Sequence, residues 1–185
     1  MGSVSKLPAS LRFNYRDYLL LPEDRRYEII DGDLYMVPAP VPYHQRIAQR
    51  INVLLYQHVV ERDLGEVLFA PCDLVLTQED VVQPDIFFIS KDRLAIVGEK
   101  YITAAPDLVV EVLSPSTQDR DRTIKAKLYF REGVQELWIA DPTSKTVEVL
   151  TRGSEGFEQS GLYAGDAIVS SPLLPGLAIP LARVF

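Results

Sequence analysis

Two short segments of the chain, Val82–Ile89 and Asp107–Leu113, are apolar at most of their positions. Because successive side chains of a strand point to opposite faces, these segments fit the interior of a sheet that is covered on both sides. A carboxylate nevertheless interrupts the apolar residues of each run, Asp85 in the first and Glu111 in the second. A buried carboxylate is costly unless a cation, a basic side chain or a proton accompanies it. The sequence therefore predicts a covered sheet with two carboxylates that need partners.

Each carboxylate also has a simpler interpretation. Asp85 follows Pro84 and could merely start its strand, and Glu111 could form a buried ion pair with an Arg or Lys. Alternation with a period of two places Asp85 on the same face as Phe87, and Glu111 on the same face as Leu113. Two carboxylates on neighbouring apolar strands, followed by a helix that carries lysine, favour a functional site over two unrelated structural roles.

Periodicity and turn residues predict the surrounding elements. Asp31-Gly32 between two apolar runs predicts a β-hairpin. Apolar residues at helical spacing predict a helix from Tyr43 to Asp63, and a second helix runs from Asp119 to Glu132 before Gly133. The predicted strands are Arg26–Ile30, Asp33–Val37, Glu66–Phe69, Asp73–Thr77, Val81–Ser90, Asp107–Leu113, Gln135–Ala140 and Thr146–Thr151. This order predicts one α/β (α+β) domain over residues 1–185, with an edge extension at 153–185.

Composition excludes several classes of protein. The chain has 185 residues, 47% of them hydrophobic and 24% charged, which fits a globular protein and not a disordered or fibrous one. A net charge of −7 argues against a protein that coats nucleic acid, because that affinity comes from Lys and Arg. It does not exclude an enzyme with a local cluster of carboxylates. The chain has a single cysteine, Cys72, and therefore no internal disulfide. It has no apolar run near the ~20 residues that span a membrane, and its N-terminal sequence lacks the long apolar region of a signal peptide. These features predict a cytoplasmic protein with no membrane partner.

Several motifs together resemble one known family. The isolated Pro84-Asp85 is the least specific of them, and the run Glu111-Val-Leu-Ser-Pro-Ser-Thr117 is the most specific. The remaining motif residues are Tyr27–Gly32, His44-Gln45, Pro106–Val110, Asp121, Lys125, Tyr129, Gly133 and Trp138–Pro142. This pattern resembles the putative restriction endonuclease family of the PD-(D/E)XK nuclease superfamily, over about residues 24–150. The resemblance implies a restriction-endonuclease-like mixed β-sheet flanked by helices, with an N-terminal hairpin and a C-terminal β extension.

The chain departs from the superfamily pattern at Leu113. In the Glu-X-Lys motif the lysine lies two residues after the acid, and here that position holds leucine. The family resemblance implies that Lys125, on the following helix, takes over the role. Asp121, Lys125 and Tyr129 recur every four residues and so form one helical stripe. By itself this spacing slightly favours an ordinary surface pair of Asp121 with Lys125, and only the family resemblance reverses that order.

The resemblance also implies a mechanism, the metal-assisted hydrolysis of a phosphodiester. Asp85 and Glu111 are expected to hold Mg²⁺, for which Mn²⁺ can substitute, because Mg²⁺ takes oxygen ligands. Lys125 is expected to orient the attacking water and to offset charge on the phosphoryl group. Glu28 is a further candidate catalytic acid, although it could equally be an exposed residue of the hairpin. Candidate substrate contacts are His44 and Gln45 at the start of the long helix, and Arg122 and Tyr129 on the second helix.

Three functions remain open on the sequence alone. The first is a Mg²⁺-dependent endonuclease that acts on DNA as a homodimer. The second is a catalytically inactive binding module on the same fold, which the acidic net charge and the missing Glu-X-Lys lysine favour. A glycosidase that uses Glu111 and Asp85 is a weaker candidate, because the single Trp138 lies in a strand predicted to be buried and not in a sugar-binding cleft.

Overall fold

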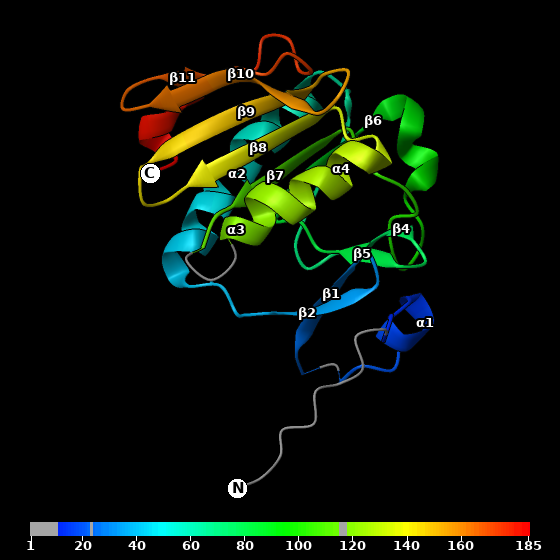
Figure 1. Ribbon diagram of the computed structural model, residues 1–185. Coiled ribbons are helices and arrows are strands. Elements are labelled where there is room, and N and C mark those ends of the chain that lie inside the picture. Colours follow the sequence, from blue (N-terminus) through cyan, green and yellow to red (C-terminus); the bar gives the residue numbers. More distant parts are fainter. Residues whose placement is uncertain (1–10, 23, 115–117) are drawn as a thin grey trace, which may run out of the picture.

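The computed structural model describes residues 11–22, 24–114 and 118–185. A six-stranded mixed sheet forms its centre, with the order β10-β9-β8-β7-β6-β3 (Figure 1). Strands β7 and β8 run parallel, and the other neighbours are antiparallel. The strands are β3 (Gly65–Phe69), β6 (Ile86–Ser90), β7 (Leu108–Val112), β8 (Glu136–Asp141), β9 (Thr146–Arg152) and β10 (Phe157–Ala164). The mixed α+β fold class predicted from the sequence is confirmed.

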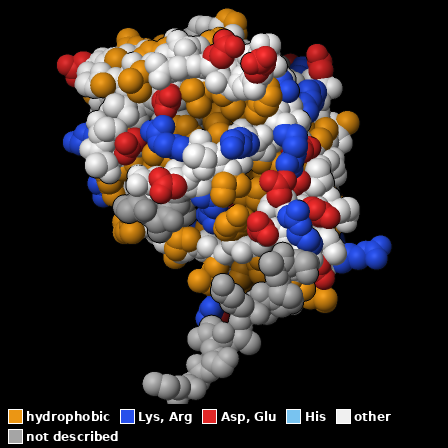
Figure 2. Space-filling view, in the orientation of Figure 1, with side chains coloured by type: hydrophobic (Ala, Val, Ile, Leu, Met, Phe, Trp, Pro, Cys, Tyr) orange, Lys and Arg blue, Asp and Glu red, His pale blue; other side chains and the backbone are white. Residues whose placement is uncertain are grey.

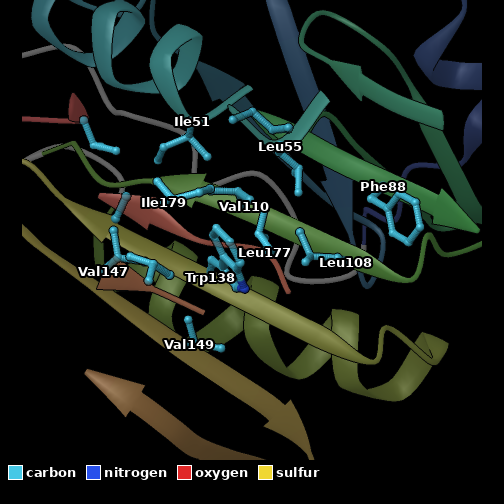
Figure 3. Close-up of a cluster of buried hydrophobic side chains, with 14 of the residues drawn as sticks. Ile51, Leu55, Phe88, Leu108, Val110, Trp138, Val147, Val149, Leu177 and Ile179 are labelled. Carbon is cyan, nitrogen blue, oxygen red and sulfur yellow. The ribbon is translucent and has the colours of Figure 1, made fainter. Parts of the chain in front are cut away.

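Helices cover the central sheet on both faces (Figure 1), which explains why β6, β7 and β8 are apolar at most of their positions. Helix α2 (Pro42–Glu61) packs on one face, where Ile51 and Leu55 meet Val110 and Trp138 (Figure 3). Trp138 is fully buried, as predicted. The other face packs against α4 (Ala126–Glu132). In the described part of the chain, no helix is both long and apolar enough to cross a membrane.

A second, four-stranded sheet lies beside the first, with the order β2-β1-β5-β4. Its strands are β1 (Arg26–Ile30), β2 (Asp33–Val37), β4 (Leu74–Thr77) and β5 (Asp80–Val82). The predicted hairpin is confirmed, because Asp31 and Gly32 have φ of 49° and 75°, the left-handed values of a tight hairpin turn. The predicted single strand Val81–Ser90 is wrong. It is divided between β5 and β6 in different sheets, because Pro84 lacks the N–H that a ladder requires.

The second predicted helix consists of three parts. They are α3 (Gln118–Arg120), a π-helical turn (Asp121–Lys125) and α4, which ends at Gly133 with a φ of 101°. π-Helical turns are rare and frequently occur at functional sites. The family motif residues 115–117 lie outside the described residues. The shorter helices are α1 (Tyr15–Tyr18) and the 3₁₀ segments Lys91–Ile96 and Leu181–Arg183.

The predicted C-terminal β extension is present, although the sequence did not reveal its long edge strand β10. A two-stranded unit, β11 (Ile168–Val169) with β12 (Ile179–Pro180), follows it. The buried Glu136 carboxylate binds this extension to the core by accepting hydrogen bonds from Ser171 Oγ (2.6 Å) and Leu173 N (2.9 Å), and it also accepts one from Trp138 Nε1 (2.7 Å) on its own strand. These donors allow the Glu136 carboxylate to be buried.

Candidate active site

A cavity of about 210 Å³ lies where β1 of the small sheet, β7 of the central sheet and the π-helical turn come together. The start of α2 and the segment before β6 complete its wall. Its charged and titratable lining residues are Arg26, Glu28, His44, Asp85, Glu111, Arg120, Asp121 and Lys125. The catalytic candidates from the sequence, Asp85, Glu111, Lys125 and Glu28, therefore meet in one place.

Lys125 lies at the centre of this group and is only 3% exposed. Its Nζ is 2.7 Å from Glu111 Oε1, 3.0 Å from Glu28 Oε1 and 3.7 Å from Asp121 Oδ1. Burial lowers the pKa of the Lys125 ammonium, but Glu111 and Glu28 outweigh this effect and hold that pKa well above its usual value. Lys125 is therefore a buried, fully charged ammonium, and the interpretation of Asp121 and Lys125 as a surface pair is wrong.

Glu111 projects from the middle of β7 and is 3% exposed. Its Oε1 accepts a hydrogen bond from Tyr129 Oη at 2.5 Å, in addition to its contact with Lys125. Burial raises the pKa of the Glu111 carboxyl to about 8, against the opposing effect of Lys125. A cation near this carboxyl would favour its ionised form. The buried ion pair proposed as the alternative role of Glu111 is present in this geometry.

Asp85 precedes β6 and faces the same cavity. The pairing of β6 with β7 ends at Ile86 opposite Val110, and Asp85 and Glu111 are the residues that adjoin this last pair. Asp85 Oδ2 accepts a hydrogen bond from Val112 N at 2.8 Å. It is also 3.2 Å from His44 Nε2. Burial lowers the pKa of the His44 imidazole, but the hydrogen bond to Asp85 outweighs this, so that the pKa of His44 is raised.

Glu28 is buried, 1% exposed, although it belongs to the hairpin and pairs with Tyr35 across β2. The interpretation of Glu28 as an exposed hairpin residue is wrong. Its Oε1 accepts a hydrogen bond from Gln83 N at 3.1 Å, and its Oε2 is 3.4 Å from Arg120 Nη2. The Arg120 guanidinium also lies 5.3 Å from the centre of the Tyr35 ring. These contacts hold Glu28 beside Lys125.

Arg120 is the functional candidate that the sequence did not single out. Arg120 and Arg122 are two residues apart in one basic helix, but Arg120 lines the cavity whereas Arg122 pairs with Glu148 (2.8 Å) outside it. The interval of five residues from Arg120 to Lys125 matches a π-helical turn, but no residue pattern in this segment predicts such a turn. Gln45 also lies outside this cavity. On the face shown in Figure 2, basic and acidic side chains are intermixed and no patch of one sign forms.

The carboxylates of this cavity fit Mg²⁺ if water molecules and a substrate phosphate supply the remaining ligands. Among the described residues, no group of three or more His, Cys, Asp or Glu is arranged to hold a metal ion. Mg²⁺, however, is commonly held by one or two carboxylates, several waters and the phosphate of the substrate. Asp85, just before β6, and Glu111, on the neighbouring β7, line one cavity and fit that kind of open site and not a closed one made entirely of protein ligands.

Comparisons with known proteins bear on the family and the fold of the chain. A family model described as Uma2, putative restriction endonuclease, matches residues 15–182. An uncharacterised protein from Synechocystis is 29% identical over 146 residues, which cover 76% of this chain and 74% of that protein. The crystal structure of a putative nuclease belonging to DUF820 from Anabaena variabilis matches with a TM-score of 0.77 and 22% identity, over 94% of this chain and 97% of that one.

Proposed function

The chain belongs to the Uma2 family of putative restriction endonucleases, and we propose that it is a divalent-metal-dependent endonuclease that hydrolyses phosphodiester bonds of DNA. The observation that carries this proposal is the buried Lys125 ammonium, which touches Glu111 in the cavity that Asp85 also lines. A buried charge of this kind is expensive to maintain, and strongly perturbed groups gather at functional sites.

Asp85 and Glu111 are the residues that would hold Mg²⁺, or Mn²⁺ in its place. Such an ion, when bound, polarises a phosphoryl oxygen and makes a water molecule more acidic. His44 holds Asp85 through the Nε2 contact, and Tyr129 holds Glu111 through its hydroxyl. These neighbours orient both carboxylates before substrate arrives.

Lys125 supplies a fixed positive charge at the reacting phosphate. Glu28 and Glu111 hold its ammonium from two sides, so the charge is in place without rearrangement during the reaction. There it orients the attacking water and offsets negative charge that develops on the phosphoryl oxygens. Arg120, which also lines the cavity, adds a second cation for the phosphate.

A nuclease-fold binding module without catalysis is the second candidate function. Two observations favour it, the net charge of −7 and the pairing of Arg120 and Lys125 with Glu28. Only the first candidate predicts hydrolysis. A homodimer located in the cytoplasm belongs to the same proposal, and sedimentation of the purified protein tests the dimer.

Nicking of a supercoiled plasmid tests the proposed activity. The wild-type protein is expected to nick DNA with Mg²⁺ or Mn²⁺ and not with EDTA, and a parallel assay with RNA identifies the preferred substrate. Asp85→Asn and Glu111→Gln are expected to abolish nicking. Glu99→Gln, which changes an exposed carboxylate away from the cavity, serves as the control. Nicking that persists in Glu111→Gln, or a wild-type protein without any nicking, contradicts the proposal.

A further inference from the structure

A second cavity, of about 680 Å³, opens beside the candidate active site. It lies between helix α2 and the end of strand β3, and Asp85 lines both cavities. We call it the α2 groove and define it by Gln45, Arg46, Gln49, Asn52, Phe69 and Asp85. The active-site cavity, at about 210 Å³, is much smaller. A polymeric substrate whose phosphate reaches Asp85 therefore has room to continue into the α2 groove.

Amide side chains form one wall of the α2 groove. Gln45, Gln49 and Asn52 are separated by four and three residues, so they form one stripe along α2. Gln45 and Gln49 are exposed, and within the described part of the chain their side chains hydrogen-bond to no protein group. Asn52 Oδ1 is buried and has no hydrogen-bond partner among the described residues. The wall therefore offers unused donors and acceptors.

An aromatic ring forms part of the opposite wall. Phe69, at the end of β3, is 60% exposed, so much of its ring is accessible to a ligand. An exposed aromatic face can stack on a nucleic-acid base of any sequence. Arg46 is the cation of this groove, whereas phosphate-binding surfaces gather several Lys and Arg. The groove is thus suited to bases more than to phosphates.

We propose that the α2 groove binds bases of the substrate strand next to the phosphate that is cleaved. This inference rests on the proposed function, because it assumes that the neighbouring cavity accepts a phosphodiester of nucleic acid. Phe69 stacks on an unpaired base, and the α2 amides hydrogen-bond to base edges. Amides both donate and accept, as adenine does with its N6 amino group and N7. Continuity through Asp85 with the catalytic cavity identifies the occupant as the substrate strand.

The test measures binding without turnover. Fluorescence anisotropy follows labelled single strands of about 12 nucleotides, one of DNA and one of RNA, with Ca²⁺ in place of Mg²⁺. Phe69→Ala is expected to weaken binding about tenfold, and Gln49→Ala several-fold. The matched controls are Leu162→Ala, which truncates an equally exposed side chain (60%) on β10, and Gln57→Ala, an exposed amide of α2 outside the groove. Both controls are expected to keep wild-type affinity.

Three results overturn the inference. They are a wild-type protein that binds neither strand, groove variants that bind as the controls do, and a Phe69→Ala protein whose oligomeric mass changes while its affinity does not. The last result would make this face an interface between copies of the chain. Tighter binding of either strand supports the groove and identifies that nucleic acid as its ligand. Binding that depends on Phe69 in a protein that never nicks a plasmid contradicts the proposed function and leaves the groove in place.

Discussion

Replacement of Lys125 by methionine tests the central feature of the candidate site. Methionine keeps most of the side-chain volume but removes the ammonium that contacts Glu28 (3.0 Å) and Glu111 (2.7 Å). Removing one partner of a buried ion pair costs about 3–5 kcal/mol, because the remaining charge stays buried without compensation. Arg120 still contacts Glu28, and Tyr129 still donates to Glu111. We therefore expect a loss near the lower end of that range, about 3 kcal/mol.

Urea unfolding followed by the fluorescence of the fully buried Trp138 measures this loss. Lys127→Met is the control, because Lys127 lies two residues away on the same helix and is exposed, and it should change stability by less than about 0.5 kcal/mol. In the nicking assay Lys125→Met should lose about 10²–10³-fold in rate, the scale for one lost charge stabiliser. Its metal binding should persist.

A second substitution separates electrostatics from packing. In the Lys125→Met background, Glu111→Gln removes the uncompensated charge and should restore part of the lost stability. Equal and small effects of Lys125→Met and Lys127→Met on stability and on nicking would refute a central role for the Lys125 charge. That role is also refuted if Glu111→Gln further destabilises the Lys125→Met protein at pH 8.

Three other perturbations probe separate parts of the molecule. Without metal, Glu111→Gln should be as stable as the wild type near pH 4.5 and more stable than the wild type towards pH 8. The pKa of Glu111 is about 8 in the folded protein and 4.5 ordinarily. The wild type therefore loses folding stability as the pH rises between these two values. A difference in urea stability between the two proteins that stays constant with pH would contradict this pH dependence. A thermal shift by Mg²⁺ that survives in Glu111→Gln would contradict the role of Glu111 as a metal ligand. His44→Phe removes the group that holds Asp85 and should weaken Mg²⁺ binding about 10–100-fold by calorimetry, and unchanged affinity would exclude His44 as a positioning residue. Glu136→Ala leaves Trp138 Nε1, Ser171 Oγ and Leu173 N without their acceptor and should destabilise the fold by about 2–4 kcal/mol in urea, whereas a loss below about 0.5 kcal/mol would show that the C-terminal extension does not depend on this contact.

Local sequence patterns predicted the hairpin and the long helix correctly, because turn residues and apolar spacing are sufficient to specify them. The hairpin at Asp31-Gly32 follows from tolerance of positive φ, and helix α2 from its apolar spacing. The edge strand β10 escaped prediction because its outward residues are polar and its sequence lacks the apolar runs of the central strands. Helix 119–132 was located, but its π-helical turn was not, because a π-helical turn has no comparable sequence signature.

The sequence by itself determined that the Glu111 carboxylate is buried, because its neighbours on both faces of β7 are apolar, and it placed Asp85 next to the equally apolar β6. Their partners depend on tertiary structure. Glu28, Arg120 and Lys125 come from distant parts of the chain, and only the packing of the small sheet and the π-helical turn against β7 brings them together. Hydrophobic periodicity records whether a side chain is buried. It does not indicate which charged side chain pairs with a buried carboxylate, because such pairs form between segments far apart in sequence.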